Sequence, residues 1–114
     1  MILAGGIGDE DGDELIAVSF SGRKKWSLTL PGAAYSLYSA SAASSRPWVA
    51  VGMRGGLVHV IDTTEGKIIA SVGAQGDEPQ IAWLASKSSE SPLLVIATGR
   101  AIKAYIVASN TEEN

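Results

Sequence analysis

The sequence repeats itself at a spacing of 45 residues, and this repetition limits the available folds more than any other feature. Independent strands would not keep one spacing across three segments, so we infer that the chain is built from a repeated unit. The matching segments are residues 35–41 with 80–86, 48–51 with 93–96, and 57–60 with 102–105. In a further copy upstream, residues 16–18 and 21–28 resemble 58–60 and 65–72 at offsets of 42 and 44.

Each unit consists of short apolar runs that end at clusters of Gly, Pro, Ser or Asp, which is the pattern of strands joined by tight turns. We expect positive φ at the turn glycines of residues 21–22, 31–32, 54–56 and 65–66. The run at 57–61 alternates only weakly, which predicts a strand covered on both faces. The sequence predicts no helix and ten strands, at 2–6, 14–20, 24–30, 34–41, 47–53, 57–63, 67–73, 79–86, 92–98 and 101–108.

Four short strands in about 45 residues are typical of one blade of a β-propeller. We therefore predict an all-β chain of about two and a half four-stranded antiparallel blades, in a propeller that is partial or completed by oligomerisation. With strands named a to d from the axis outward, the chain would supply b-c-d, then a-b-c-d, then a-b-c. The expected segments are a partial blade at 1–32, a complete blade at 33–77, a partial blade at 78–109 and a polar tail at 110–114.

Residues 56–72 resemble the repeat of quinoprotein-type (PQQ-like) propellers, in which a glycine, an apolar strand, a Thr-Gly-Lys turn and a strand carrying tryptophan follow one another. Asp62, Gly66 and Lys67 occupy matching positions. The tryptophan position is Ala70 in this copy and Trp26 in the upstream one. The resemblance implies that Trp26 ties neighbouring blades together. WD-type (WD40-like) propellers have similar blades, but this sequence lacks their Gly-His and Trp-Asp signature.

The resemblance implies two kinds of activity. Some quinoprotein propellers bind the quinone cofactor with calcium and oxidise alcohols, whereas many proteins with these repeats bind no cofactor and act as scaffolds. The enzymatic form needs about eight blades and an axial site assembled from several of them. A chain of 114 residues cannot build that site alone. We therefore predict no enzyme activity, no catalytic residues and no bound cofactor.

An acidic segment at residues 8–14 is the most suggestive candidate for a ligand site. The carboxylates of Asp9, Asp11 and Asp13 alternate along the chain and could converge on one calcium ion. The segment is also similar to the calcium loop of FG-GAP propeller repeats. However, Glu14 stands at the sixth position, where such a loop has glycine. A solvated acidic turn is the alternative, and we predict no metal site.

The remaining candidates have structural explanations. His59 is the single histidine and has no neighbouring ligand set, so we expect it to pack within a strand. The serine-rich runs at 39–45 and 86–91 lack a nucleophile elbow and predict loops. The glycine-rich segment at 52–56 lacks a following helix and predicts a turn. We expect inter-blade packing from six aromatic residues, namely Trp26, Trp48, Trp83, Tyr35, Tyr38 and Tyr105.

Charge and composition exclude several partners. The formal net charge is −3 without a basic stripe, which argues against nucleic acid. The longest apolar run, at 93–97, is too short to cross a membrane, and the N-terminus lacks a signal-peptide pattern. There is no cysteine, so disulfides and thiolate zinc sites are excluded. Charged residues make up 18%, below the roughly 25% of typical domains, which predicts an apolar surface patch for a partner.

These features predict a non-catalytic scaffold or binding module that acts through protein contacts. Its ring would be completed by copies of itself, by other chains or by a longer parent, because broken blades leave unpaired edges and faces. The polar tail is expected to be a natural C-terminus, which places the missing half-blade upstream or in another chain. The alternatives are the C-terminal part of a quinoprotein-like or calcium-binding enzyme propeller, and a lectin-like propeller that binds sugars.

Overall fold

The computed structural model describes residues 2–5, 14–41, 43–73, 79–86, 91–98 and 101–107, and these residues contain ten strands and no helix. The expectation of an all-β chain is therefore confirmed. No described segment is helical, so none has the form of a membrane-crossing helix. The strands are β1 (Ile2–Gly5), β2 (Glu14–Val18), β3 (Lys24–Thr29), β4 (Ala34–Ser39), β5 (Trp48–Met53), β6 (Leu57–Asp62), β7 (Lys67–Gly73), β8 (Gln80–Leu84), β9 (Leu93–Ala97) and β10 (Ile102–Ile106).

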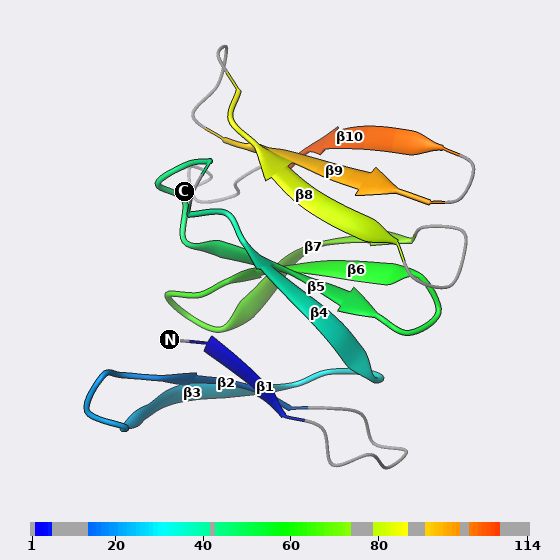
Figure 1. The fold of residues 1–114 in the computed structure, drawn as a ribbon. Helices are drawn as coiled ribbons and strands as arrows, with labels where there is room; N and C mark the ends of the chain where they lie inside the picture. The colour runs from blue at the N-terminus through cyan, green and yellow to red at the C-terminus, as the bar shows by residue number, and fades with distance from the viewer. Residues whose placement is uncertain are drawn as a thin grey trace.

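The strands form three separate antiparallel sheets. The N-terminal sheet has the order β1-β2-β3, the central sheet β4-β5-β6-β7 and the C-terminal sheet β8-β9-β10. Figure 1 shows the three sheets stacked in chain order, with the central sheet between the other two. All pairings join consecutive strands, and within the described residues none of the sheets closes on itself. The central sheet is the only one of the three to which the described chain gives four strands.

The core consists of two apolar clusters, one on each face of the central sheet. In β5 all six residues are buried, because alternate side chains enter opposite clusters. Val49 and Val51 pack toward Leu15 of the N-terminal sheet. Trp48 and Ala50 enter the other cluster, which includes residues of β8 and β9. Val58 and Val60 of β6 lie in one cluster and Ile61 lies in the other, so the prediction that the strand at 57–61 is covered on both faces is confirmed.

The turn prediction is confirmed at three of its four sites. Glycines with positive φ occur in the connections β2–β3, β5–β6 and β6–β7, each of which joins two strands of one sheet. The prediction is wrong for Gly32, which does not adopt a positive φ. The reason is that residues 30–33 lead from the N-terminal sheet into the central sheet, so no tight hairpin is needed there.

The spacing of 45 residues does not correspond to one structural register. Tyr38 pairs with Ala50 across β4 and β5, whereas Trp83 pairs with Leu94 across β8 and β9, so the partners lie 44 apart. Both Tyr38 and Trp83 pack against the cluster between the central and C-terminal sheets. Tyr38 therefore lies on the face of its sheet that looks toward the next sheet along the chain, whereas Trp83 lies on the face that looks toward the preceding sheet. A register shift at residues 34–36 of β4 has no counterpart in β8. A one-residue shift turns a side chain to the other face, so residues 45 apart in these strands do not occupy equivalent positions, although the order of the strands is the same.

Candidate functional site

Trp26 of β3 links the N-terminal sheet to the central sheet. Its Nε1 donates a hydrogen bond of 2.8 Å to the carbonyl oxygen of Thr63. The indole also lies directly against Gly66, where a Cβ atom would stand 2.5 Å from Trp26 Cδ2. Gly66 has a φ of 73°, so both its conformation and its lack of a side chain suit this contact. The sequence singled out both residues, and the structure brings them together.

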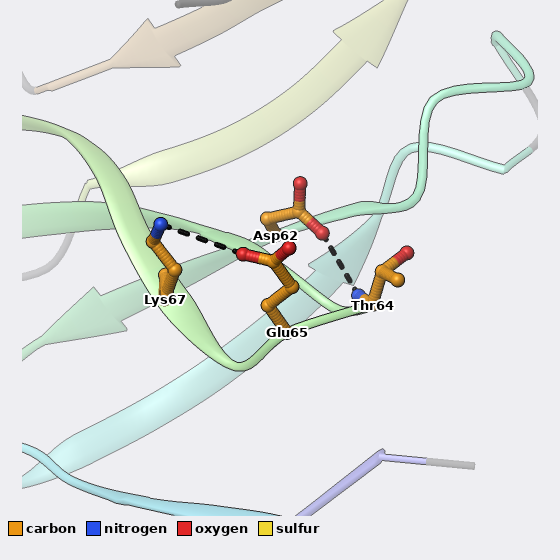
Figure 2. Close-up of polar contacts among 4 residues, drawn as sticks. All are labelled: Asp62, Thr64, Glu65 and Lys67. Carbon is orange, nitrogen blue, oxygen red and sulfur yellow. Dashed lines mark hydrogen bonds and ion pairs between the residues drawn. The ribbon is translucent and has the colours of Figure 1, made fainter. Parts of the chain in front are cut away.

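The turn between β6 and β7 carries the polar residues of the sequence motif (Figure 2). Asp62 Oδ1 accepts a hydrogen bond of 2.8 Å from the Thr64 backbone N–H. The Gly66 N–H donates to the Asp62 carbonyl oxygen at 2.8 Å, which closes the turn. Lys67 Nζ lies 3.4 Å from Glu65 Oε1, but both side chains are more than 60% exposed. The Asp62 carboxylate thus holds the turn that receives Trp26.

Aromatic residues join the central and C-terminal sheets in a different way. Trp83 Nε1 of β8 donates a hydrogen bond of 2.8 Å to the Tyr38 carbonyl oxygen of β4. Its ring lies 6.3 Å from the ring of Trp48, at an interplanar angle of 42°. The Tyr35 hydroxyl donates to the Pro79 carbonyl oxygen at 3.3 Å. The predicted role of the aromatic residues in packing between sheets is confirmed at these positions.

His59 is buried in β6 between its cross-strand partners Val51 and Ser71. Its Nδ1 lies 2.7 Å from the Ser71 Oγ, whereas its Nε2 is buried without a hydrogen-bond partner. Burial lowers the pKa of the imidazole below 6.5, because the charged form loses solvation. This geometry suits a neutral imidazole that packs against Ser71, its cross-strand neighbour in β7.

An open cleft of about 400 Å³ lies at one end of the central sheet. The Arg46 guanidinium stands 5.6 Å from the centre of the Trp48 ring at this cleft. Its described lining contains hydroxyl groups and one cation, but no carboxylate, imidazole or thiol that could serve in acid–base chemistry. Sequence analysis did not single out Arg46, which carries no motif. The lining residues are Leu37, Ser39, Ser41, Arg46, Pro47, Trp48, Val49 and Thr63.

The C-terminal sheet has an apolar face that points away from the central sheet. Its inward residues, such as Ile81, Leu94 and Ile96, belong to the core, so the alternate residues lie on the other face. The registers align these residues in three rows across β8, β9 and β10. We call this surface the outer face; it consists of Gln80, Ala82, Leu84, Leu93, Val95, Ala97, Ile102, Ala104 and Ile106.

The outer face carries no charged residue and only one polar residue, Gln80. Leu84 is 52% exposed, and Ile102 and Ile106 are each 74% exposed. Such a contiguous apolar surface is the patch that the low content of charged residues predicted. The apolar character of the outer face could be predicted from the unbroken apolar run of β9. Its position at the end of the stack could not be predicted from the sequence.

The proposed calcium loop of Asp9, Asp11 and Asp13 lies outside the described residues. Among the residues that are described, no group of three His, Cys, Asp or Glu side chains is placed to hold a metal ion. The serine-rich segments are described only in part, and Ser39 Oγ donates to Ser41 Oγ at 3.1 Å within the first of them.

Comparison with known proteins finds no matching family model, no matching curated protein and no matching solved structure.

Proposed function

We propose that this chain is a non-catalytic scaffold or binding module built from β-propeller blades, which works through protein–protein contacts. The observation that carries the proposal is the outer face. Soluble proteins rarely leave a contiguous apolar surface of this kind open, and such surfaces usually bind a partner. Both apolar faces of the central sheet are already covered by neighbouring sheets. The outer face is also an apolar sheet surface, but no described part of the chain packs on it.

The arrangement of the strands supports the assignment to propeller blades. The three sheets contain three, four and three strands, as expected for strands b-c-d, a-b-c-d and a-b-c of successive blades. Under this assignment, the described residues supply no strand a beside β1 and no strand d beside β10. The packing of Trp26 on Gly66 supports the quinoprotein-type repeat, in which a tryptophan ties neighbouring blades together. A scaffold whose strand edges and end face are open is suited to binding further β-structure.

The enzymatic alternative requires a quinone cofactor with calcium. The described residues do not fit that group, because they offer no carboxylate cluster for the ion. Titration with the quinone and calcium, followed by the melting temperature, separates the two functions. A scaffold is expected to show no change, whereas a rise in melting temperature that saturates with either ligand would favour the enzyme.

Hydrogen exchange on the dilute chain tests the scaffold function directly. Because the outer face is uncovered, we expect amides of β8, β9 and β10 to exchange faster than those of β5 and β6. A partner that covers the outer face should then slow exchange in these three strands. If the strands of the C-terminal sheet are as protected as β5 and β6 in a dilute monomer, the face needs no cover and the proposal fails.

A further inference from the structure

The two end sheets of the stack differ in the chemistry of their free faces. The outer face of the C-terminal sheet has no charge, and its most exposed residues are Ile102 and Ile106. On the N-terminal sheet, Leu15 and Ala17 are buried, so the alternate residues Glu14 and Ile16 lie on the free face with their cross-strand neighbours Thr29 and Ser27, and this face is mixed in character. The stack therefore has one apolar end and one end that includes charged and hydroxyl groups.

This difference decides between two ways in which copies of the chain could meet. In a head-to-tail contact, the apolar face would cover the face that carries Glu14, and the carboxylate would lose solvation without a partner charge. In a contact between two outer faces, apolar rows meet apolar rows and no charge is buried. The second arrangement also has two-fold symmetry, so it closes after two copies.

The size of the surface fits a weak pair. From the rise along a strand and the spacing between strands, three strands of five residues cover roughly 17 Å by 14 Å. Full coverage of such a face from both copies hides roughly 480 Å² of flat sheet area, which is below the about 1,000 Å² of specific interfaces, so the contact is expected to be weak. Two sheets packed face to face at about 10 Å would resemble the sheet contacts already present within the chain.

We propose that the outer face binds the outer face of a second copy of this chain, and that the two C-terminal sheets form a two-layer sandwich around a two-fold axis. The inference rests on the proposed function and names the partner of that surface. The pair should be in equilibrium with the monomer between about 1 μM and 1 mM, as expected for a contact smaller than most specific interfaces.

Cross-linking by single cysteines tests the geometry, and the chain has no cysteine of its own to interfere. Val95 is the middle residue of the middle strand, so Val95→Cys places thiols near the expected axis. Ser27→Cys is the matched control on the free face of the N-terminal sheet, opposite Ile16. Under oxidation, Val95→Cys should form a disulfide-linked dimer and Ser27→Cys should remain mostly monomeric. Cross-linking of Ser27→Cys alone would overturn the proposal.

Sedimentation velocity across the same concentrations tests the energetics. Ile106→Glu puts a charge at a corner of the outer face, in the row of Leu84 and Leu93, and should weaken dimerisation at least tenfold. Phe20→Glu is the matched control, because Phe20 is 98% exposed on the turn between β2 and β3 and lies outside the outer face. Ile106 is 74% exposed, so its substitution should leave the fold intact, which circular dichroism verifies.

A chain that stays monomeric up to 1 mM, or a dimer that Ile106→Glu leaves unchanged, would overturn the inference. So would open-ended assemblies, which indicate head-to-tail contact. None of these results would remove the scaffold function, which fails only if the hydrogen exchange of β8, β9 and β10 matches that of β5 and β6.

Discussion

The indole ring of Trp26 lies so close to Gly66 that a methyl group on that glycine would stand 2.5 Å from Cδ2 and 2.8 Å from Cγ. The two residues belong to different sheets, and the hydrogen bond from Trp26 Nε1 to the Thr63 carbonyl oxygen fixes the ring in this position. The N-terminal and central sheets are therefore held together at a point that depends on one glycine.

Gly66→Ala should destabilise the chain by about 2–4 kcal/mol, because it combines a positive φ with a collision against the indole ring. Gly22→Ala is the matched control. Gly22 also has a positive φ, of 89°, but no atom lies within 4 Å of its added Cβ, so we expect a loss of only about 1 kcal/mol. Urea denaturation measures both. Equal losses would mean that the collision is relieved without cost.

Trp83→Phe should cost about 1–2 kcal/mol, because it removes the hydrogen bond to the Tyr38 carbonyl oxygen and keeps most of the ring packing against Trp48. Trp83→Leu should cost more, since the ring contact is lost as well. Thermal unfolding of the two variants separates these contributions. No loss in Trp83→Phe would show that water replaces the hydrogen bond fully.

Stability should fall as the pH is lowered through the range in which His59 titrates. Its pKa is lowered in the folded chain, so between the folded pKa and 6.5 the unfolded chain binds more protons. The contribution of neutral His59 is complete above 6.5 and is lost as the pH falls to the folded pKa. Melting temperatures between about pH 5 and pH 8 should change less in His59→Gln than in the parent chain. Parallel profiles would contradict this expectation.

Asp62→Ala should cost about 1 kcal/mol, because Oδ1 no longer accepts the Thr64 N–H in the turn below Trp26. Asp62→Asn keeps an acceptor oxygen and should lose less. By contrast, Lys67→Met should change the free energy of unfolding by less than about 0.5 kcal/mol, since its ion pair with Glu65 is exposed. A larger effect of Lys67→Met than of Asp62→Ala would reverse this ranking.

Gly52→Ala should destabilise the packing between the central and C-terminal sheets by about 1–3 kcal/mol. The added Cβ would lie 2.6 Å from Ser36 Oγ and 3.3 Å from Ile81 Cδ1. Gly73→Ala is the control within a strand, because no atom lies within 4 Å of its added Cβ and its φ is not positive. Differential scanning calorimetry of the two variants gives the comparison, and equal melting temperatures would show that Ser36 moves aside freely.

The positions of the strands could be predicted well, because the residues that define a strand and its turns are neighbours in the sequence. The apolar runs and the glycine turns are set by side-chain alternation and by φ preferences, and all ten strands end within two residues of the expected positions. The register between strands could not be predicted, because it depends on how separate strands pair. Tyr38 and Trp83 look equivalent in sequence, yet one residue of shift places them on opposite faces.

The candidate site could be predicted only in part. Trp26 and Gly66 were each recognisable from the repeat, but their contact depends on how two sheets stack. The low content of charged residues predicted an apolar surface patch. Its location on the outer face could be determined only from the structure, which shows which sheet faces are covered in the stack. The cleft beside Arg46 gave no signal, because its lining comes from β4, β5, the loop between them and Thr63 after β6.

The complete burial of β5 has a consequence for the chain during its synthesis. The central sheet leaves the ribosome before β8 and β9 do, so the side of β5 that carries Trp48 and Ala50 is exposed to water at that stage. A nascent chain whose synthesis pauses at this stage would expose an apolar surface to neighbouring nascent chains on the same polysome. Rapid translation of the segment that forms β8, β9 and β10, or a chaperone that shields Trp48, would protect the nascent protein until the C-terminal sheet has folded onto β5.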